Sequence, residues 1–448
     1  MKKLTRSQFT QISIMLFGLF FGAGNLIFPP FLGNQAGNNM IISLLSFSVT
    51  AVVFPILGAI AVGKTDGLKN LSNRVGPTFA IVFTTAIYLS IGPGLGIPRA
   101  GSVPFEMAIA PYVPETMSLS IARLTYTSLF FMAALWICLK PNKLVERVGK
   151  YLTPALLLLI SFMFVRVMSL PKDVAQAVGE YSTAPAVKGF LAGYETMDAV
   201  AALNFGFVVT LAIRRFGVEE KNEVTKYTAK AGLVAGSVLF IVYVMLSKIG
   251  MATSNTFVGS ENGAVVLTKA VEYALGRQGL VLLAAIFTLA CLTTCVGLIS
   301  SGSEYFCSLF NNKLSYSAWV VVWTLFSFIM ANFGLNNLLA FSVPLLTIIY
   351  PVALVLIVMG VTDDFLKYSK YSYKFSAFFA VVLPLISVVS TTFKTNIPLL
   401  TKLESALPMS KHGLSWVLPS LFVVLLVEFT TKLFLSSEVK VEDGVYLN

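Results

Sequence analysis

Long apolar segments alternate with short polar ones along nearly the whole chain. An apolar segment of about 17–25 residues is long enough to cross the hydrocarbon core of a bilayer as a helix. The pattern therefore predicts an all-α polytopic membrane protein with about 12 transmembrane helices. Their predicted bounds are 8–33, 39–62, 76–97, 118–139, 144–168, 188–213, 226–252, 279–308, 315–333, 337–361, 373–392 and 413–435.

The first apolar segment contains residues that interrupt a helix. Gly18, Gly22, Gly24 and the pair Pro29–Pro30 all fall within it. A helix broken at membrane depth is tolerated only against protein or a wet cavity, and it presents free amides from one half and free carbonyls from the other. Such groups hold a small zwitterion and a cation. The alternative is a proline-kinked helix that packs closely through its glycines.

The sixth segment is interrupted in the same way. The run Gly193-Tyr-Glu-Thr-Met-Asp198 stands at its middle, and Glu195 and Asp198 would share a face if this run were helical. An ionisable residue at this depth is a functional hypothesis by default. The alternative is a carboxyl group that is protonated or that caps a neighbouring helix.

The spacing of the two interrupted segments suggests an internal repeat. They lie about 170 residues apart, and each is followed by four regular segments, which is typical of five-helix units of opposite topology. We therefore predict a first repeat over 8–168, an inverted second repeat over 188–361 and two additional helices over 373–435.

Three further stretches suggest function. The eighth segment contains Ala290-Cys-Leu-Thr-Thr294, whose hydroxyls either bond back to their own helix or help to hold a hard cation. The run Ile91–Gly101 has too much glycine and proline for a regular helix, and Arg99 within it is expected to meet an acidic group. Residues 254–278 predict an amphipathic helix, either a lid or a helix lying at the interface.

The composition agrees with a membrane protein. Of 448 residues, 56% are hydrophobic and 12% charged, about half the charged fraction of soluble proteins. The net charge of +11 does not indicate nucleic-acid binding, because the basic residues stand singly between apolar segments. Roughly two thirds of the 32 Lys and Arg residues, Lys2, Lys432 and Lys440 among them, fall on one side, so both termini are predicted to be cytoplasmic.

Nothing in the sequence is typical of an enzyme. Cys138, Cys291, Cys295 and Cys307 lie in or at the ends of apolar segments, and His412 has no partner in sequence. A nucleotide-binding loop and the repeated filter of a channel are absent as well. We expect a secondary transporter without an organic cofactor, and the sequence suggests no obligatory protein partner.

Four motifs in order resemble one known family. They are Phe21-Gly-Ala-Gly-Asn-Leu-Ile-Phe-Pro-Pro30, Gly96-Ile-Pro-Arg99, Gly193-Tyr-x-Thr-Met-Asp198 and Leu292-Thr-Thr-x-Val-Gly-Leu298. Together they resemble the bacterial branched-chain amino acid:cation symporters (LIVCS) of the amino acid–polyamine–organocation superfamily. The resemblance covers essentially the whole chain. It implies the inverted 5+5 helix repeat of the leucine-transporter type, with helices 1 and 6 broken. It also implies uptake of leucine, isoleucine and valine across the bacterial cytoplasmic membrane with sodium as coupling ion, protons being possible in some members.

The resemblance also implies roles for individual residues. The unwound first helix would hold the substrate carboxylate, and the unwound sixth helix would offer carbonyls to the ammonium group. The implied substrate-binding residues are Gly22, Ala23, Gly24, Asn25, Gly193, Tyr194, Glu195 and Thr196. The implied sodium-binding residues are Gly18, Phe21, Ala290, Thr293 and Thr294, with threonine where the fold commonly has a final serine. Candidates for proton binding or gating are Glu195, Asp198 and Arg99, and a proton-coupled symporter or exchanger that uses Glu195 or Asp198 is the alternative.

Overall fold

The computed structural model describes residues 3–333, 335–392 and 398–442. Side chains at 334–343, 391–401 and 432–448 lie outside the described set. Lys2, Lys432 and Lys440 of the charge count, and parts of the predicted segments 337–361, 373–392 and 413–435, therefore lie outside it as well. The chain forms two compact units, and each is described separately. Unit 1 comprises Met1–Gly63 and Ile87–Ser342, and unit 2 comprises Lys64–Ala86 and Val343–Asn448.

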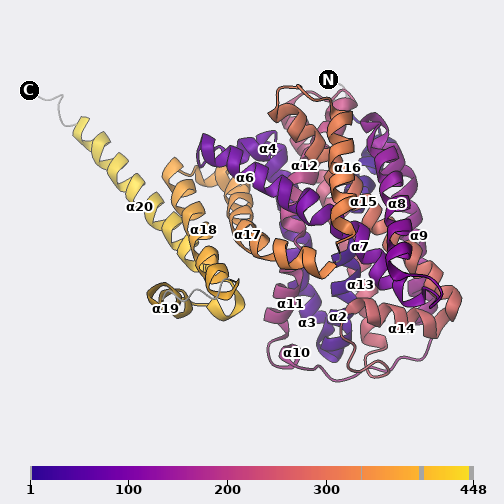
Figure 1. Ribbon diagram of the computed structural model, residues 1–448. Coiled ribbons are helices and arrows are strands. Elements are labelled where there is room, and N and C mark those ends of the chain that lie inside the picture. The colour runs from indigo at the N-terminus through magenta and orange to yellow at the C-terminus, as the bar shows by residue number, and fades with distance from the viewer. Residues whose placement is uncertain (1–2, 334, 393–397, 443–448) are drawn as a thin grey trace, which may run out of the picture. The chain divides into compact units, whose positions relative to one another are not determined.

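All regular secondary structure among the described residues is helical (Figure 1). The α-helices in chain order are α1 (Arg6–Phe20), α2 (Ala23–Ala36), α3 (Met40–Ser48), α4 (Phe54–Thr65), α5 (Leu68–Ser72), α6 (Pro77–Leu89), α7 (Gly96–Ala108), α8 (Leu119–Cys138), α9 (Thr153–Met168), α10 (Glu180–Thr183), α11 (Pro185–Tyr194), α12 (Asp198–Arg215), α13 (Lys221–Ala252), α14 (Gly263–Leu275), α15 (Arg277–Leu309), α16 (Tyr316–Ala331), α17 (Leu335–Leu366), α18 (Lys370–Thr392), α19 (Pro398–Ala406) and α20 (Val417–Glu442). Three π-helical segments, Val49–Val53, Ser90–Gly94 and Val145–Leu152, interrupt longer spans.

Each predicted segment coincides with helix, and the third is longer than predicted. Its predicted end at residue 97 is wrong, because the span continues through α7 as one apolar stretch, Pro77–Tyr112. The cause is a local break rather than an end: Gly92 leaves the helical region (φ −82°, ψ −119°) beside Pro93, and the chain turns helical again at Gly96. Of the described helices, eight are long and apolar enough to span a membrane, and the bent pair α11–α12 adds a ninth.

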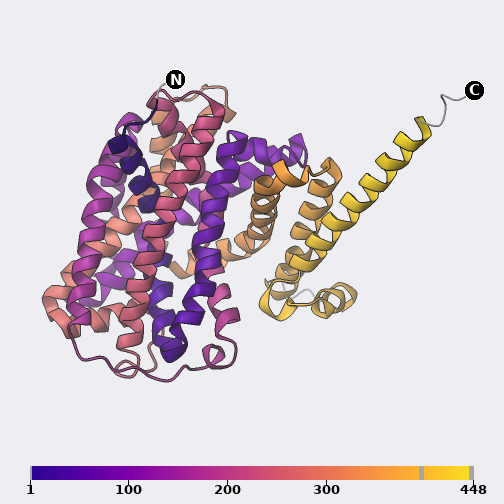
Figure 2. The same cartoon turned by 180° about the vertical axis from the view of Figure 1, so that it is seen from behind.

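Within unit 1, helices approach one another closely through glycine. A Cβ on Gly33 of α2 would lie 1.9 Å from the Ser247 carbonyl oxygen of α13, and one on Gly250 of α13 would lie 1.9 Å from the Pro30 carbonyl oxygen. A Cβ on Gly263 of α14 would lie 1.7 Å from the Ile27 carbonyl oxygen. Figure 2 shows this group of helices from behind. Small residues allow such contacts between membrane helices, so the second half of the first span is closely packed, as the alternative interpretation of its glycines expects.

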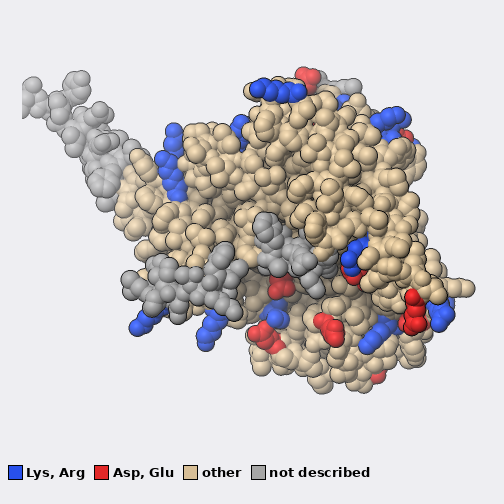
Figure 3. Space-filling view, in the orientation of Figure 1, with Lys and Arg blue, Asp and Glu red and all other residues tan. Residues whose placement is uncertain are grey.

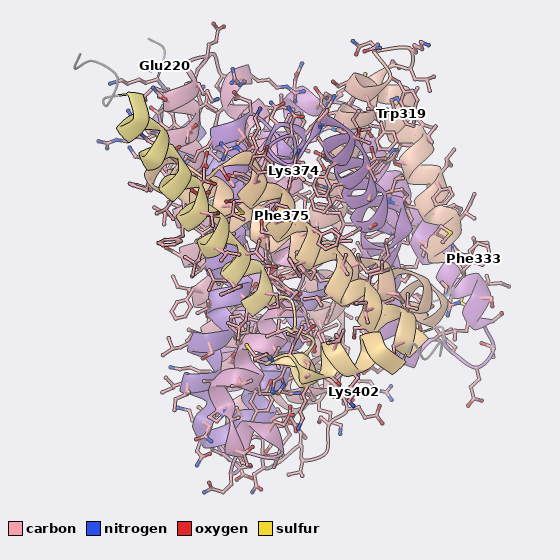
Figure 4. All side chains as sticks on the ribbon, turned by 90° about the vertical axis from the view of Figure 1, so that its left-hand side faces the viewer. Glu220, Trp319, Phe333, Lys374, Phe375 and Lys402 are labelled. Atoms are coloured by element: carbon pink, nitrogen blue, oxygen red, sulfur yellow. The ribbon has the colours of Figure 1, made fainter. Side chains whose placement is uncertain are left out.

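Charged side chains lie mainly at the two ends of unit 1. On the face shown in Figure 3 the band between these ends is almost uncharged. The outward faces of α8 and α9 expose large apolar side chains such as Leu129, Trp136 and Leu158. Figure 4 places Glu220, before α13, and Trp319, near the start of α16, at the same end of the molecule. An uncharged band with exposed apolar side chains is the surface expected of a protein surrounded by lipid.

Unit 2 is joined by ion pairs and by a half-buried cap. Lys64 lies 2.7 Å from Asp364, and Arg74 lies 2.8 Å from Asp363. Glu428 of α20 accepts hydrogen bonds from the Ser369 amide (2.8 Å) and the Ser372 hydroxyl (2.6 Å) at the start of α18. The boundaries of the two units do not follow those predicted for the repeats, because unit 1 contains helices of both. The domain boundaries 8–168, 188–361 and 373–435 stay predictions.

Candidate functional site

The first span breaks where its glycines predict. Helix α1 ends at Phe20 and α2 begins at Ala23, with Gly22 in an extended conformation between them. The Gly22 amide donates to the Asn25 side chain (2.9 Å). Within the described chain, no backbone amide donates to the carbonyls of Gly18 or Phe21. The break therefore leaves helix-end carbonyls on one side and the first amides of α2 on the other.

The sixth span breaks between Tyr194 and Asp198. Its two halves, α11 and α12, meet at 44°, and Met197 takes the left-handed conformation (φ 62°). The Gly193 carbonyl already accepts from the Thr196 hydroxyl (2.8 Å), and the Tyr194 carbonyl accepts from the Met197 amide (3.2 Å). The Glu195 and Thr196 carbonyls accept no backbone hydrogen bond from the described residues. Of the four carbonyls predicted to face an ammonium group, these two remain open.

Gly193 itself has a packing role. A Cβ there would lie 2.2 Å from the Thr50 hydroxyl and 2.3 Å from the Phe47 carbonyl oxygen. Phe47 lies in α3, and Thr50 lies in the π-helical segment that follows it. Thr50 in turn donates to the Phe190 carbonyl (2.9 Å). Glycine is thus needed at this position because α11 lies directly on the second span, whether or not a substrate is present.

The two breaks meet in a buried hydrogen-bonded cluster. The Asn25 amide group donates to the Asp198 carboxylate and to the Tyr243 hydroxyl, and the Tyr243 hydroxyl also donates to Asp198 (3.3 Å). The exposed fractions are 2% for Asn25, 5% for Asp198 and 0% for Tyr243. A Cβ on Gly24 would lie 3.8 Å from the Thr196 Cα. Segments more than 170 residues apart in sequence therefore form one site.

Glu195 and Asp198 do not share a helix face. The run between them is not helical, so the condition on which that expectation depended is not met. Glu195 is exposed, whereas Asp198 is buried beside Asn25. Asp198 belongs to the cluster, whereas the Glu195 side chain does not.

Tyr243 was not predicted. It lies in the middle of α13 among valine, leucine and methionine, and the sequence does not distinguish it from an ordinary packing aromatic residue. The one available signal is chemical: a buried tyrosine hydroxyl needs a hydrogen-bond partner.

The eighth span, α15, faces the first break through Thr294. A Cβ on Gly22 would lie 3.0 Å from the Thr294 hydroxyl oxygen, and this oxygen is buried without a hydrogen-bond partner in the described chain. Thr293 instead donates to the Ala290 carbonyl (2.9 Å), the back-bonded alternative foreseen for a threonine in a membrane helix. On the side where Gly18 would carry a Cβ, its nearest neighbour is Thr153 of α9, 2.1 Å from a Cβ built there.

Arg99 lies on the first turn of α7. No carboxylate among the described residues lies within ion-pair distance of it. The expectation that Arg99 meets an acidic group stays a prediction.

The predicted amphipathic helix forms as α14. Its apolar residues Val266, Leu267, Ala270 and Val271 are buried. Asn262 caps it by accepting from the Val265 amide (3.0 Å). The helix packs against α2 and α15. Its role, as a lid or as a helix lying at the interface, stays a prediction.

A cavity of about 270 Å³ lies at another place in unit 1, where α12, α15 and α16 meet. It is lined by Arg215 and Glu304, 3.9 Å apart, and by Ser300 and Tyr316 among others. None of the predicted substrate or sodium residues lines it.

Comparison with known proteins identifies the family. A model of the branched-chain amino acid transport proteins matches residues 5–434. The chain belongs to this family. The branched-chain amino acid permease BrnQ of Lactobacillus delbrueckii subsp. lactis is 37% identical over 432 residues, with 93% of this chain and 95% of the relative covered. The permease BraB of Bacillus subtilis (strain 168) is 39% identical over 415 residues, with 92% of each covered.

A solved structure shows the fold. MhsT in complex with L-phenylalanine superposes with a TM-score of 0.54 at 15% identity, covering 95% of this chain and 98% of that one. The predicted all-helical fold of the leucine-transporter type is confirmed. Since the family consists of membrane transport proteins, the chain is a multi-span transporter and not an enzyme. Its partners are the bilayer and a small transported molecule.

Proposed function

We propose that the protein is a symporter that takes up leucine, isoleucine and valine across the bacterial cytoplasmic membrane, driven by sodium. The observation that carries the proposal is the meeting of the two helix breaks, with Asn25 bonded to Asp198 and the unpaired Thr294 hydroxyl facing Gly22. The substrate class follows from the family and from the names of its relatives, which are branched-chain amino acid permeases.

The substrate carboxylate would bind at the start of α2. The first amides of a helix have no intrahelical partner, and the helix dipole favours an anion there. The amides of Ala23, Gly24 and Asn25 donate to no backbone carbonyl of the described residues, which leaves them for the carboxylate. The space beside Gly24 is open, because a Cβ there would have its nearest neighbours, on Phe28, at 3.6 Å.

The substrate ammonium group would then lie toward the sixth span. The open carbonyls of Glu195 and Thr196 are the acceptors that the break leaves there. A zwitterion would therefore be bound between two helix ends, with its charged groups away from lipid.

The coupling ion would lie between the first and eighth spans. A sodium ion that leaves water needs oxygen ligands in place of its hydration shell. The Gly18 and Phe21 carbonyls accept no backbone bond, and Thr294 has an unpaired hydroxyl. Thr293 keeps its oxygen lone pairs while it donates to Ala290. Because the ion would hold helices from both repeats together, sodium and leucine would each raise the affinity for the other by the same factor.

A proton-coupled carrier is the second candidate, and one observation favours it. Asp198 is a buried carboxyl group inside a transporter, which is a common place for a proton relay. Exposed Glu195 is the weaker candidate for the same role.

The orientation follows from the basic residues. The end of unit 1 near Glu220 and Trp319 (Figure 4) also carries Arg214 and Lys313, so we place it in the cytoplasm. The cavity between Arg215 and Glu304 lies near that end, and we assign it to the path by which the substrate leaves.

Uptake of radiolabelled leucine into proteoliposomes tests the coupling. Sodium and proton gradients are imposed separately, each with the membrane potential clamped. We expect accumulation with an inward sodium gradient alone, and Thr294→Ala should need more sodium. Thr210→Ala is the matched control, because this buried threonine only bonds back to Gly206 (2.9 Å). Uptake that follows the proton gradient and ignores sodium would refute the sodium assignment and favour Asp198 as proton site.

A further inference from the structure

Two buried threonine hydroxyls near the first break have no hydrogen-bond partner within the described chain. One is Thr294 of α15 and the other is Thr153, the first residue of α9. Thr153 is 0% exposed. Other buried threonines of unit 1, such as Thr127 and Thr228, donate to the carbonyl four residues earlier. A buried hydroxyl without a partner is unfavourable and calls for an explanation.

Both hydroxyls face the same short stretch of the first span. A Cβ built on Gly18 would lie 2.1 Å from the Thr153 hydroxyl oxygen, and one on Gly22 would lie 3.0 Å from that of Thr294. These glycines are four residues apart, about 6 Å along a helix axis. The stretch between them ends in carbonyls that accept no backbone hydrogen bond. A hydroxyl of α9 and a hydroxyl of α15 thus lie against Gly18 and Gly22, on either side of these carbonyls in the chain.

The backbone before Thr153 packs on α1. The π-helical segment Val145–Leu152 leads into α9, and wider turns of this kind are frequent at functional sites. Within it Gly149 packs on α1 so closely that a Cβ would lie 2.2 Å from the Gln11 carbonyl oxygen. The segment therefore lies directly against α1, and the Thr153 hydroxyl lies over Gly18.

We propose that Thr153 supplies an additional oxygen ligand to the coupling cation, beside Thr294 and the carbonyls of the first span. The inference rests on the proposed sodium coupling and extends it to α9, a helix to which no sodium ligand was assigned. Hydroxyl and carbonyl oxygens are the groups that replace the hydration shell of a small monovalent cation. Cation binding would then tie α1 to both α9 and α15.

Sodium dependence of leucine binding to the purified full-length protein tests the proposal, with an organic cation keeping the ionic strength constant. Thr153→Val keeps the volume and removes the oxygen, and Thr153→Ser keeps the oxygen. We expect the valine variant to need about 5–150-fold more sodium while leucine affinity at saturating sodium stays nearly normal. The serine variant should stay within about threefold of the unmodified protein. The control is Thr84→Val, because the Thr84 hydroxyl is equally buried and unpaired.

Thermal unfolding in sodium-free buffer separates a ligand from a packing residue. Thr153→Val should unfold at no lower temperature than the unmodified protein, since it removes an unpaired hydroxyl at constant volume. The role of Thr153 would be overturned if Thr153→Val unfolds at a lower temperature and Thr153→Ser does not restore the unfolding temperature. It would also be overturned if Thr153→Val keeps the normal sodium dependence while Thr294→Ala needs more sodium. Either result would leave sodium coupling intact. Leucine binding that ignores sodium in the unmodified protein would overturn both. If the valine variant cannot be purified, Thr153→Ala serves in the same comparison.

Discussion

Removing one hydroxyl from the buried cluster tests whether it organises the binding site. Tyr243→Phe deletes the acceptor of one Asn25 N–H and the donor to Asp198, while the ring keeps its place. Asn25 is left with a buried unpaired N–H, which costs about 1–3 kcal/mol. The bond to Asp198 adds little, because 3.3 Å is long for an O–H···O contact. We expect Tyr243→Phe to cost the hydrogen-bonded cluster about 1–3 kcal/mol of stabilising free energy in total.

This loss should appear in both stability and binding. If the cluster orients the start of α2, the leucine dissociation constant should rise by up to about 5–150-fold, the equivalent of 1–3 kcal/mol. Leucine binding by scintillation proximity and thermal unfolding in detergent measure the two effects. Tyr88→Phe is the matched control: Tyr88 is buried, is stacked on Tyr305 with a centroid distance of 4.4 Å, and makes no side-chain hydrogen bond to the described residues. Unchanged leucine affinity in Tyr243→Phe, or an equal change in Tyr88→Phe, would refute an organising role.

The remaining predictions concern the pocket and the packing. Gly24→Leu should abolish leucine binding in a folded protein, whereas Gly24→Ala should retain it, because a Cβ there meets only ordinary contacts at 3.6–3.8 Å; near-normal binding by the leucine variant would remove the carboxylate site from α2. Leucine, isoleucine and valine should compete for uptake within about 10–200-fold of one another, and strong inhibition by lysine or glutamate would contradict an apolar pocket. Gly263→Ala should lower the free energy of unfolding by about 1–3 kcal/mol, since its Cβ would lie 1.7 Å from the Ile27 carbonyl oxygen. Gly76→Ala, with open space around it, should unfold like the unmodified protein.

Much of the site was predictable from the sequence, because glycine and proline act locally. The break at Phe21–Gly22 and the one after Tyr194 lie where the motifs place them. The end of the third span was predicted wrongly. Gly92 and Pro93 interrupt the helix locally, but whether the helix then ends or resumes depends on what packs against α7. The roles of the individual threonines were equally undecided, since Thr293 and Thr294 are neighbours in sequence and only one of them bonds back to its own helix.

The sequence by itself determined the fold class and the helical segments, because the cost of unpaired backbone groups in hydrocarbon leaves apolar stretches of this length little choice but helix. It also determined where helices break. The tertiary structure alone decided which side chains face each break: Asp198 is buried beside Asn25 whereas Glu195 is exposed, Tyr243 completes the cluster from α13, and Thr153 lies over Gly18. Such contacts join residues far apart in the chain and depend on the rotation of each helix, which the packing of its neighbours sets and a local pattern does not contain.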